Sequence, residues 1–230
     1  MGGVVVKKPF VRPSGVVVVV DTTFFRRTFG VAVIRSPHLK KNLAWLETKT
    51  ETALTYHELR WQIDKKGFEI QAAVIDGKSG LIEVFWDVPI QMCQFHQIAI
   101  MTRYLTTKPK LLAGQTLRHI SLQITKSNQD EMQKLLDDWY AIWGDFLKQK
   151  TYNPITKRWF YTHKKLRSAY RSITRNLPHL YTYQKFPELN IPNTTNSLDG
   201  SFAHLKDMLR IHRGLSKDRK LKMIDEILSK

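Results

Sequence analysis

The sequence has one cysteine, Cys93, among its 230 residues. A single thiol cannot close a disulfide within the chain, which excludes a disulfide framework and is typical of a reducing cytoplasm. No apolar run approaches the roughly 20 residues of a membrane span, and the apolar stretch at residues 4–6 is too short for a signal peptide. We therefore expect a cytoplasmic protein with no membrane partner.

Two common catalytic motifs are also missing. The sequence holds no G-x-x-x-x-G-K-[ST] phosphate loop, so we expect no nucleotide cofactor. It has no G-x-S-x-G nucleophile elbow either, and Cys93 has no obvious nucleophile context. The energy for any strand joining would then come from the phosphodiester that is exchanged.

Acidic residues are scarce: 20 aspartates and glutamates stand against 37 lysines and arginines, which gives a formal charge of +17. This excess favours an anionic partner, with nucleic acid ahead of a membrane surface. Between Asp145 and Glu188 there is no acid, and aromatic residues alternate with basic ones. Basic side chains neutralise phosphates and aromatic faces stack on unpaired bases, so this segment predicts nucleic-acid binding. The residues expected to make these contacts are Lys157, Arg158, Lys164, Lys165, Arg167, Arg171 and Arg175.

A second interpretation of that segment is a helix pair whose aromatic residues form a core while its charges are solvated. The two interpretations are compatible, because one helix has two faces.

The first hundred residues alternate between predicted strands and helices. A helix is predicted over 56–66, where Gly67 is a suitable C-terminal residue, and another runs from His96 to Tyr104. The first three strands are expected to be antiparallel neighbours, and the whole pattern indicates an α/β fold around a mixed sheet. Strands are predicted over 15–20, 29–34, 43–48, 69–75 and 90–93.

From about residue 108 the pattern becomes helical. Ser127 and Asn128 precede Asp130 and Glu131, which is an N-terminal capping signature. A further helix is predicted over 163–177, ending before Pro178. We therefore predict three parts: residues 1–107 as the first part of the sheet core, 108–186 as an all-helical basic insertion, and 187–230 as C-terminal helices that return to the core.

Three carboxylates are candidates for a metal site. Asp21 and Asp76 each follow a predicted buried strand, and Asp199 lies one turn into a helix with an apolar stripe of Leu198, Phe202, Leu205 and Leu209. Carboxylates that meet repel one another unless a divalent cation lies between them. Such a site can hold two Mg²⁺ or Mn²⁺ ions and activate an oxygen for attack on a phosphodiester. Taken singly, each acid has a simpler interpretation: a strand end, an Asp-Gly turn, or a partner for Lys206.

Several separated motifs occur in an order that resembles a known family: DTTFF, VIDGKSGL, CQFH and TTNSLDGSFAHLKDMLRIHRGLS. Together they resemble the catalytic domain of Mutator-like bacterial insertion-sequence transposases, a branch of the DDE transposase superfamily, over residues 15–216. The resemblance implies an RNase H-like fold interrupted by an all-α insertion. It also implies metal-dependent hydrolysis and strand transfer at transposon ends, with DNA as the partner on the nucleoid and a homodimer or larger assembly on DNA.

The resemblance also assigns roles to residues. Asp21, Asp76 and Asp199 are the catalytic, metal-binding acids, with two Mg²⁺ or Mn²⁺ ions as cofactors. Cys93 and His96 form the C-x-x-H element, for which we favour a role in shaping the site; the alternative is a buried pair with no chemical role. Near the third acid, we expect Lys206, Arg210, His212 and Arg213 to contact DNA phosphates; the alternative is that they are solvated charges on the helix surface.

The chain departs from the family pattern in two ways. The third acid is normally glutamate, and aspartate has the same charge but one methylene less reach. Family members carry a DNA-binding region before the first acid, where this chain has about 20 residues, so recognition of specific ends is the function expected to be missing. Two alternatives to a transposase are a nuclease that cleaves without joining and an inactive nucleic-acid-binding relict.

Overall fold

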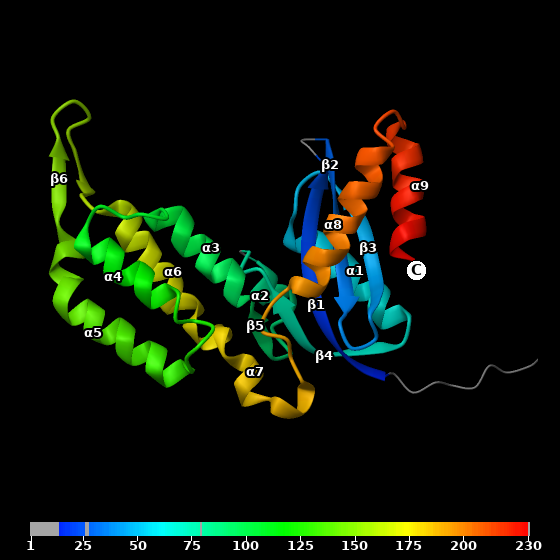
Figure 1. The fold of residues 1–230 in the computed structure, drawn as a ribbon, viewed down its shortest axis with the longest axis horizontal. Coiled ribbons are helices and arrows are strands. Elements are labelled where there is room, and N and C mark those ends of the chain that lie inside the picture. The colour runs from blue at the N-terminus through cyan, green and yellow to red at the C-terminus, as the bar shows by residue number, and fades with distance from the viewer. Residues whose placement is uncertain (1–13, 26–27, 79, 230) are drawn as a thin grey trace, which may run out of the picture.

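A five-stranded sheet in the order β3-β2-β1-β4-β5 forms the centre of one lobe of the molecule (Figure 1). The computed structural model describes residues 14–25, 28–78 and 80–229, so the apolar stretch at 4–6 lies outside the described residues. The prediction of three antiparallel neighbours is confirmed. These strands are β1 (Ser14–Phe25), β2 (Phe29–Ser36) and β3 (Lys41–Thr48).

The other two strands, β4 (Phe68–Ile75) and β5 (Ile90–Met92), run parallel to β1 on its second edge. The valine run suits this central position, because a strand covered on both faces has no need of polar residues. Val16, Val18 and Val20 belong to one core, whereas Val17 and Val19 belong to another on the opposite face. The sheet lobe therefore has three layers, as expected for an α/β fold.

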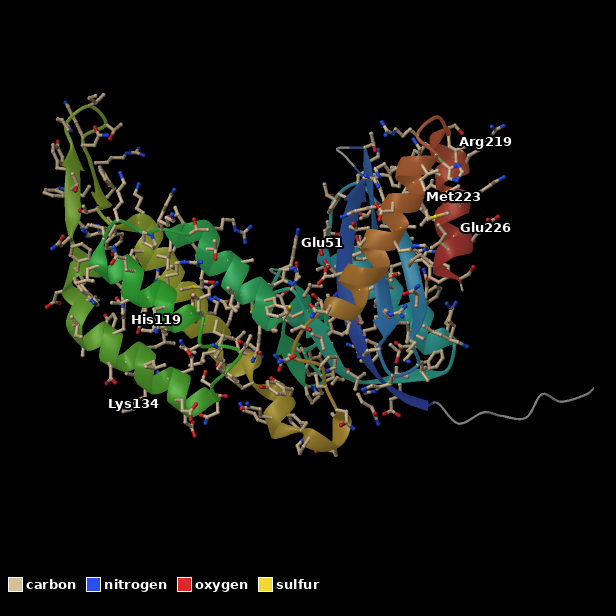
Figure 2. The ribbon with its side chains drawn as sticks, viewed as in Figure 1. Glu51, His119, Lys134, Arg219, Met223 and Glu226 are labelled. Carbon is tan, nitrogen blue, oxygen red and sulfur yellow. The ribbon has the colours of Figure 1, made fainter. Side chains whose placement is uncertain are left out.

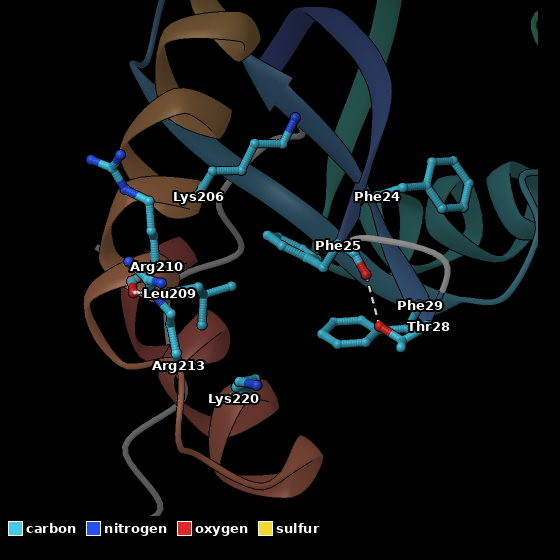
Figure 3. A pocket seen from close by; sticks show the side chains of 9 residues that line it. All are labelled: Phe24, Phe25, Thr28, Phe29, Lys206, Leu209, Arg210, Arg213 and Lys220. Carbon is cyan, nitrogen blue, oxygen red and sulfur yellow. Dashed lines mark hydrogen bonds between the residues drawn. The ribbon is translucent and has the colours of Figure 1, made fainter.

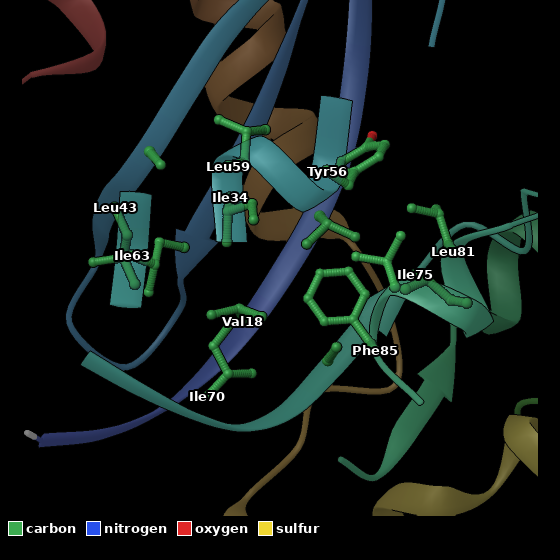
Figure 4. Close-up of a cluster of buried hydrophobic side chains, with 14 of the residues drawn as sticks. Val18, Ile34, Leu43, Tyr56, Leu59, Ile63, Ile70, Ile75, Leu81 and Phe85 are labelled. Atoms are coloured by element: carbon green, nitrogen blue, oxygen red, sulfur yellow. The ribbon is translucent and has the colours of Figure 1, made fainter. Parts of the chain in front are cut away.

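Helices cover both faces of the sheet. On one face lie α1 (Ala53–Lys65) and α2 (Leu81–Val84), and Figure 4 shows their side chains packed with those of the strands. On the other face lie α8 (Asn196–Ile211) and α9 (Lys217–Leu228). The predicted apolar stripe of α8 is buried as expected.

One strand boundary was predicted wrongly. Asp21 does not end its strand: β1 continues for four more residues and stays paired with β2, with Asp21 opposite Val33. Pairing with β4 stops earlier, at Val19 and Val74, because β4 ends at Ile75. Asp21 therefore lies in a strand that has lost one of its two neighbours.

The second lobe, called here the insertion lobe, is built from α3 (Gln94–Leu105), α4 (Leu112–Ser121), α5 (Gln129–Lys148) and α6 (Lys164–Leu180) around a separate core. The predicted capping box of Asn128 and Glu131 is present at the start of α5. No helix of the described residues is both long enough and apolar enough to cross a membrane.

The prediction of an all-helical insertion is wrong. A hairpin of β6 (Lys150–Asn153) and β7 (Arg158–Tyr161) extends from the lobe between α5 and α6 (Figure 1). Its turn is stabilised because the Asn153 side chain accepts hydrogen bonds from two backbone N–H groups, those of Ile155 and Thr156.

Pro178 also lies inside α6 and not after it. In the last turn of a helix, a proline costs one hydrogen bond and leaves the apolar stripe that ends in Leu180 intact. After α6 the chain passes through α7 (Thr182–Lys185) and a single 3₁₀ turn, Pro187–Leu189, before it returns to the sheet.

Buried glutamines join the two lobes. The side-chain amides of Gln91 and Gln94 both donate to the Leu180 carbonyl, at 2.9 and 3.0 Å. The returning chain is bound at the same place, because Asn193 exchanges two hydrogen bonds with Gln94, each 3.0 Å long. Because these buried side-chain amides are hydrogen-bonded, they hold the insertion lobe in one position against β5.

We predict that Leu205→Ala lowers the free energy of unfolding by about 2–5 kcal/mol, the usual cost of a cavity at a buried leucine. Leu205 is fully buried between α8 and the sheet. Urea denaturation followed by circular dichroism measures the change. His204→Ala, on the exposed side of the same turn, is the matched control and should change stability by less than about 0.5 kcal/mol. Equal effects in the two variants would contradict the packing of α8.

Candidate metal centre

Three acidic side chains meet where β1 and β4 separate. The parallel register places Val19 beside Val74, so two residues further along Asp21 comes beside Asp76. Glu51, in the segment that leads into α1, joins them. One carboxylate oxygen from each of Asp21, Glu51 and Asp76 lies within 4.8 Å of the other two. The three acids can therefore act together as ligands of one ion.

Glu51 was not predicted from the sequence. Figure 2 shows it on the side of the sheet lobe that faces the insertion lobe. The Tyr56 hydroxyl donates to Glu51 Oε1 at 2.7 Å, and Lys78 Nζ lies 3.2 Å from Oε2. The sequence signal for this residue is weak, since it consists of an acid directly before the helix cap Thr52, with a tyrosine one turn later.

Burial, together with the nearby charges of Asp76 and Asp199, raises the pKa of Asp21 to about 7, against the opposing effects of a 2.7 Å hydrogen bond from the Thr22 N–H and of the His96 charge. Burial also raises the pKa of Asp76, although the Lys78 N–H donates to it at 2.8 Å. Both shifts have the same origin: negative charge is held close together and away from water. A bound cation would remove this cost.

His96 supplies positive charge beside the acids. A hydrogen bond with Cys93 raises the pKa of His96 to about 9, more than burial lowers it, and the charges of Asp21 and Asp76 contribute in the same direction. Burial alone would raise the pKa of the Cys93 thiol, but hydrogen bonds with His96 and Thr195 outweigh burial and lower it. The imidazole is therefore protonated at neutral pH.

The Thr195 hydroxyl connects this pair to the third predicted acid. It lies 3.5 Å from Cys93 Sγ, 3.4 Å from His96 Nδ1 and 3.4 Å from Asp199 Oδ2. Thr195 occupies the N-cap position of α8, yet its side chain makes no capping hydrogen bond, and its hydroxyl lies beside these groups instead. The N-cap residue of α8 therefore contacts the groups of the candidate site.

Asp199 lies in the first turn of α8 and is exposed. It lies outside the group of three acids, although its charge acts on Asp21. Among the described residues Asp199 forms no ion pair with Lys206, so the simpler interpretation as its partner finds no support. The structure therefore brings together Asp21 and Asp76, adds Glu51, and leaves Asp199 beside them.

Part of the predicted nucleic-acid surface leads toward the acids. Arg171 and Arg175, on the exposed side of α6, line a groove of about 480 Å³ together with Arg103 of α3 and Lys78, two residues from Asp76. Further from the acids, Lys164 and Arg167 lie over the aromatic rings of the hairpin, at 4.7 Å from Phe160 and 4.0 Å from Tyr161.

The remaining predicted contacts are spread over two places. Lys157 and Arg158 belong to the tip of the hairpin and to β7, and Lys165 is exposed at the start of α6. A second group lies at the other end of α8, far from the hairpin along the chain. It consists of Lys206, Arg210, His212 and Arg213, all of which are exposed.

Comparison with known proteins identifies no family for this chain. No protein-family model matches the sequence, and no curated protein is significantly similar to it. The case for a function therefore depends on the cluster of acids, the protonated histidine and the basic grooves beside them.

We predict that Asp21→Asn stabilises the protein more at about pH 8 than at about pH 5, with a difference of about 2 kcal/mol. The folded state binds a proton more tightly than the unfolded state, since the Asp21 pKa rises from 3.8 to about 7. Stability from this group is therefore greatest at low pH and falls as pH rises through 7. Urea denaturation at the two pH values measures the effect.

The control for this prediction is Asp138→Asn, a carboxylate on α5 with 63% of its side chain exposed. It should give no pH-dependent gain. A gain for Asp21→Asn that is the same at both pH values would show that its carboxylate ionises normally in the folded protein.

We also predict that saturating Mg²⁺ or Mn²⁺ raises Tm at about pH 8 by roughly 3–8 °C, because an ion that binds only the folded state stabilises it by mass action. Asp76→Asn should abolish the increase, and Glu51→Gln should at least halve it. Asp138→Asn should leave it unchanged. Differential scanning fluorimetry with and without the cation measures all four proteins, and an increase that persists in Asp76→Asn would contradict the site.

Proposed function

We propose that this chain is the catalytic domain of a DDE-type DNA transposase of the Mutator-like group. Its reaction would be metal-dependent hydrolysis of a phosphodiester at a transposon end, followed by transfer of the freed strand to target DNA. The observation that carries the proposal is the meeting of Asp21, Glu51 and Asp76 within 4.8 Å, in a chain with a formal charge of +17. The RNase H-like fold belongs to the same proposal and is supported by the mixed sheet with helices on both faces.

The donor atoms fit a hard divalent cation. Asp21, Glu51 and Asp76 offer oxygen ligands alone, and carboxylate oxygens are the ligands that Mg²⁺ and Mn²⁺ prefer. The raised pKa of Asp21 fits as well, because burial first and the neighbouring carboxylates second disfavour its negative charge, and a bound ion would remove that cost. When bound, a pair of such ions would activate the attacking oxygen and stabilise the leaving one.

Each acid has a distinct part in this proposal. Asp21, in β1, and Asp76, directly after β4, would hold the metal where the pairing of these two neighbouring strands ends. Asp199, on α8, would be the third acid of the family pattern, and its charge already acts on Asp21. Glu51 is an additional ligand, held in place by Tyr56 and Lys78. With Glu51 present, the shorter reach of aspartate at position 199 need not leave a bound ion with too few carboxylates.

His96 would act on the substrate and not on the metal. A protonated imidazole donates hydrogen bonds and carries positive charge, so it suits a non-bridging oxygen of the phosphodiester under attack. Cys93 raises the pKa of the ring and so favours its protonated form, and the Thr195 hydroxyl, 3.4 Å from Nδ1, would orient it. In this role His96 stabilises the charge that grows on the phosphate in the transition state.

DNA would reach the acids along the insertion lobe. The groove that Arg103, Arg171 and Arg175 line is also lined by Gly77 and Lys78, the two residues that follow Asp76 in the chain. Phosphates bound there by arginines would place a neighbouring phosphodiester at the metal. Beyond the groove, the hairpin carries cations over Phe160 and Tyr161 and extends the same basic surface.

The proposal predicts metal-dependent cleavage and joining of DNA by the full chain. Labelled nicked and branched duplexes with Mg²⁺ or Mn²⁺ should give cut and joined products on a denaturing gel. Asp21→Asn and Asp76→Asn should each lower the rate by about 10²-fold or more, as expected when a metal ligand is lost. Asp138→Asn is the matched control and should retain the wild-type rate.

The products separate the alternatives. Cut strands without joined strands would identify a nuclease. DNA that binds but is never cut, even by Asp199→Glu, would identify a binding protein and refute the catalytic proposal.

A further inference from the structure

A second groove lies at the far end of the strand and helix that carry Asp21 and Asp199. It has a volume of about 550 Å³ and lies between the end of β1, the start of β2 and the last turns of α8 (Figure 3). Both β1 and α8 run from the acids toward this groove. The groove is therefore connected to the metal centre by two rigid elements.

The floor of the groove is apolar and aromatic. Phe25 and Phe29 lie with ring centroids 5.2 Å apart, tilted by 35°, and Figure 3 shows both rings on the strand side, facing Leu209 of α8. Phe29 is buried, whereas Phe25 is partly exposed. An aromatic ring that is partly exposed in a groove offers a surface on which a planar group can stack.

The rim of the groove is basic. It carries Lys206, Arg210, Arg213 and Lys220, and no carboxylate lines it among the described residues. Arg210 is paired with Asp207 at 3.3 Å, and Arg213 donates to a backbone carbonyl. Lys206 and Lys220 form no ion pair within the part of the chain that the structure describes. The rim thus has an excess of positive charge that an anion would neutralise.

We propose that this groove binds an unpaired end of a DNA strand, with a base on Phe25 and the adjoining phosphates on Lys206, Arg213 and Lys220. Aromatic floors with basic rims are how proteins hold single strands, because an unpaired base exposes its face. In a duplex that face is covered by the neighbouring bases, so a duplex would leave the floor unused. This inference rests on the proposed function and specifies which part of the substrate lies at this site.

The distance to the acids suits one continuous strand. Phe25 is four residues beyond Asp21, about 13 Å along a strand, and Arg210 is eleven residues beyond Asp199, about 16 Å along a helix. A stacked nucleic-acid strand advances about 3.4 Å per nucleotide. A strand with its phosphodiester at the acids would therefore place a base in the groove about four nucleotides away.

The test measures binding of the full chain to labelled DNA by fluorescence anisotropy, without divalent cations so that no cleavage occurs. The probes are one duplex with blunt ends and the same duplex with an unpaired overhang of about four nucleotides on its 3′ or its 5′ strand. We expect about tenfold tighter binding to one of the overhang probes. Phe25→Leu, which keeps the apolar volume but removes the ring, should abolish that preference and leave blunt-end binding unchanged.

Substitutions of exposed residues are included because they should not affect folding. Lys206→Gln combined with Arg213→Gln should lower the salt dependence of overhang binding by about two phosphates and change blunt-end binding much less. The controls lie outside the groove. Trp61→Leu removes an exposed aromatic ring that also has a cation over it, Lys65 at 3.5 Å, on the opposite face of the sheet. Lys222→Gln removes a cation from α9, and neither control should alter the preference.

Three other results are possible, and each would contradict either this inference or the proposed function. Equal affinity for blunt and overhang probes, with binding intact, would refute this inference and leave the proposed function standing. Binding of free thymidine monophosphate as tightly as the overhang would replace the strand with a mononucleotide. Failure to bind any DNA probe would refute the proposed function and this inference with it.

Discussion

The parallel pairing of β1 with β4 is the constraint on which the site depends. It brings Asp21 beside Asp76 just beyond the last paired residues, Val19 and Val74, at the edge of the valine core, so the backbone holds two partly buried carboxylates close together. Glu51 increases the negative charge, and Lys78 and His96 offset only part of it. Folded proteins retain unfavourable clusters of buried charge mainly at functional sites, where a ligand relieves the repulsion. The cluster of acids therefore indicates function more specifically than the basic surface does.

Charge of the opposite sign surrounds this acidic point. Arginines of α3 and α6 line one side, and the basic end of α8 lies on the other. This layout suits a polyanion as the ligand. The basic surfaces would bind its phosphates along its length, and the small acidic site would place a metal ion at one phosphodiester.

Much of the sheet could be predicted from the sequence, because β-branched runs and turn residues carry a local signal. The position of Asp21 inside β1 could not, since it depends on β4 being shorter than β1. Glu51 was missed for a similar reason: the path of the chain over the sheet, which no local pattern encodes, brings it to the acids. The β6-β7 hairpin did have a signal, since Asn153 and Pro154 lie between Tyr152 and the aromatic run Trp159–Tyr161, but its basic residues were attributed to helices.

The junction of Gln91, Gln94, Leu180 and Asn193 has a consequence for how such a chain can change. The insertion lobe leaves the sheet and returns to it at one hydrogen-bonded point, so it is a long loop closed at its base. The entropy of closing a loop rises only slowly with its length. Segments beyond the junction, such as the hairpin, can therefore be lengthened, shortened or exchanged at little cost, while the acids keep their positions.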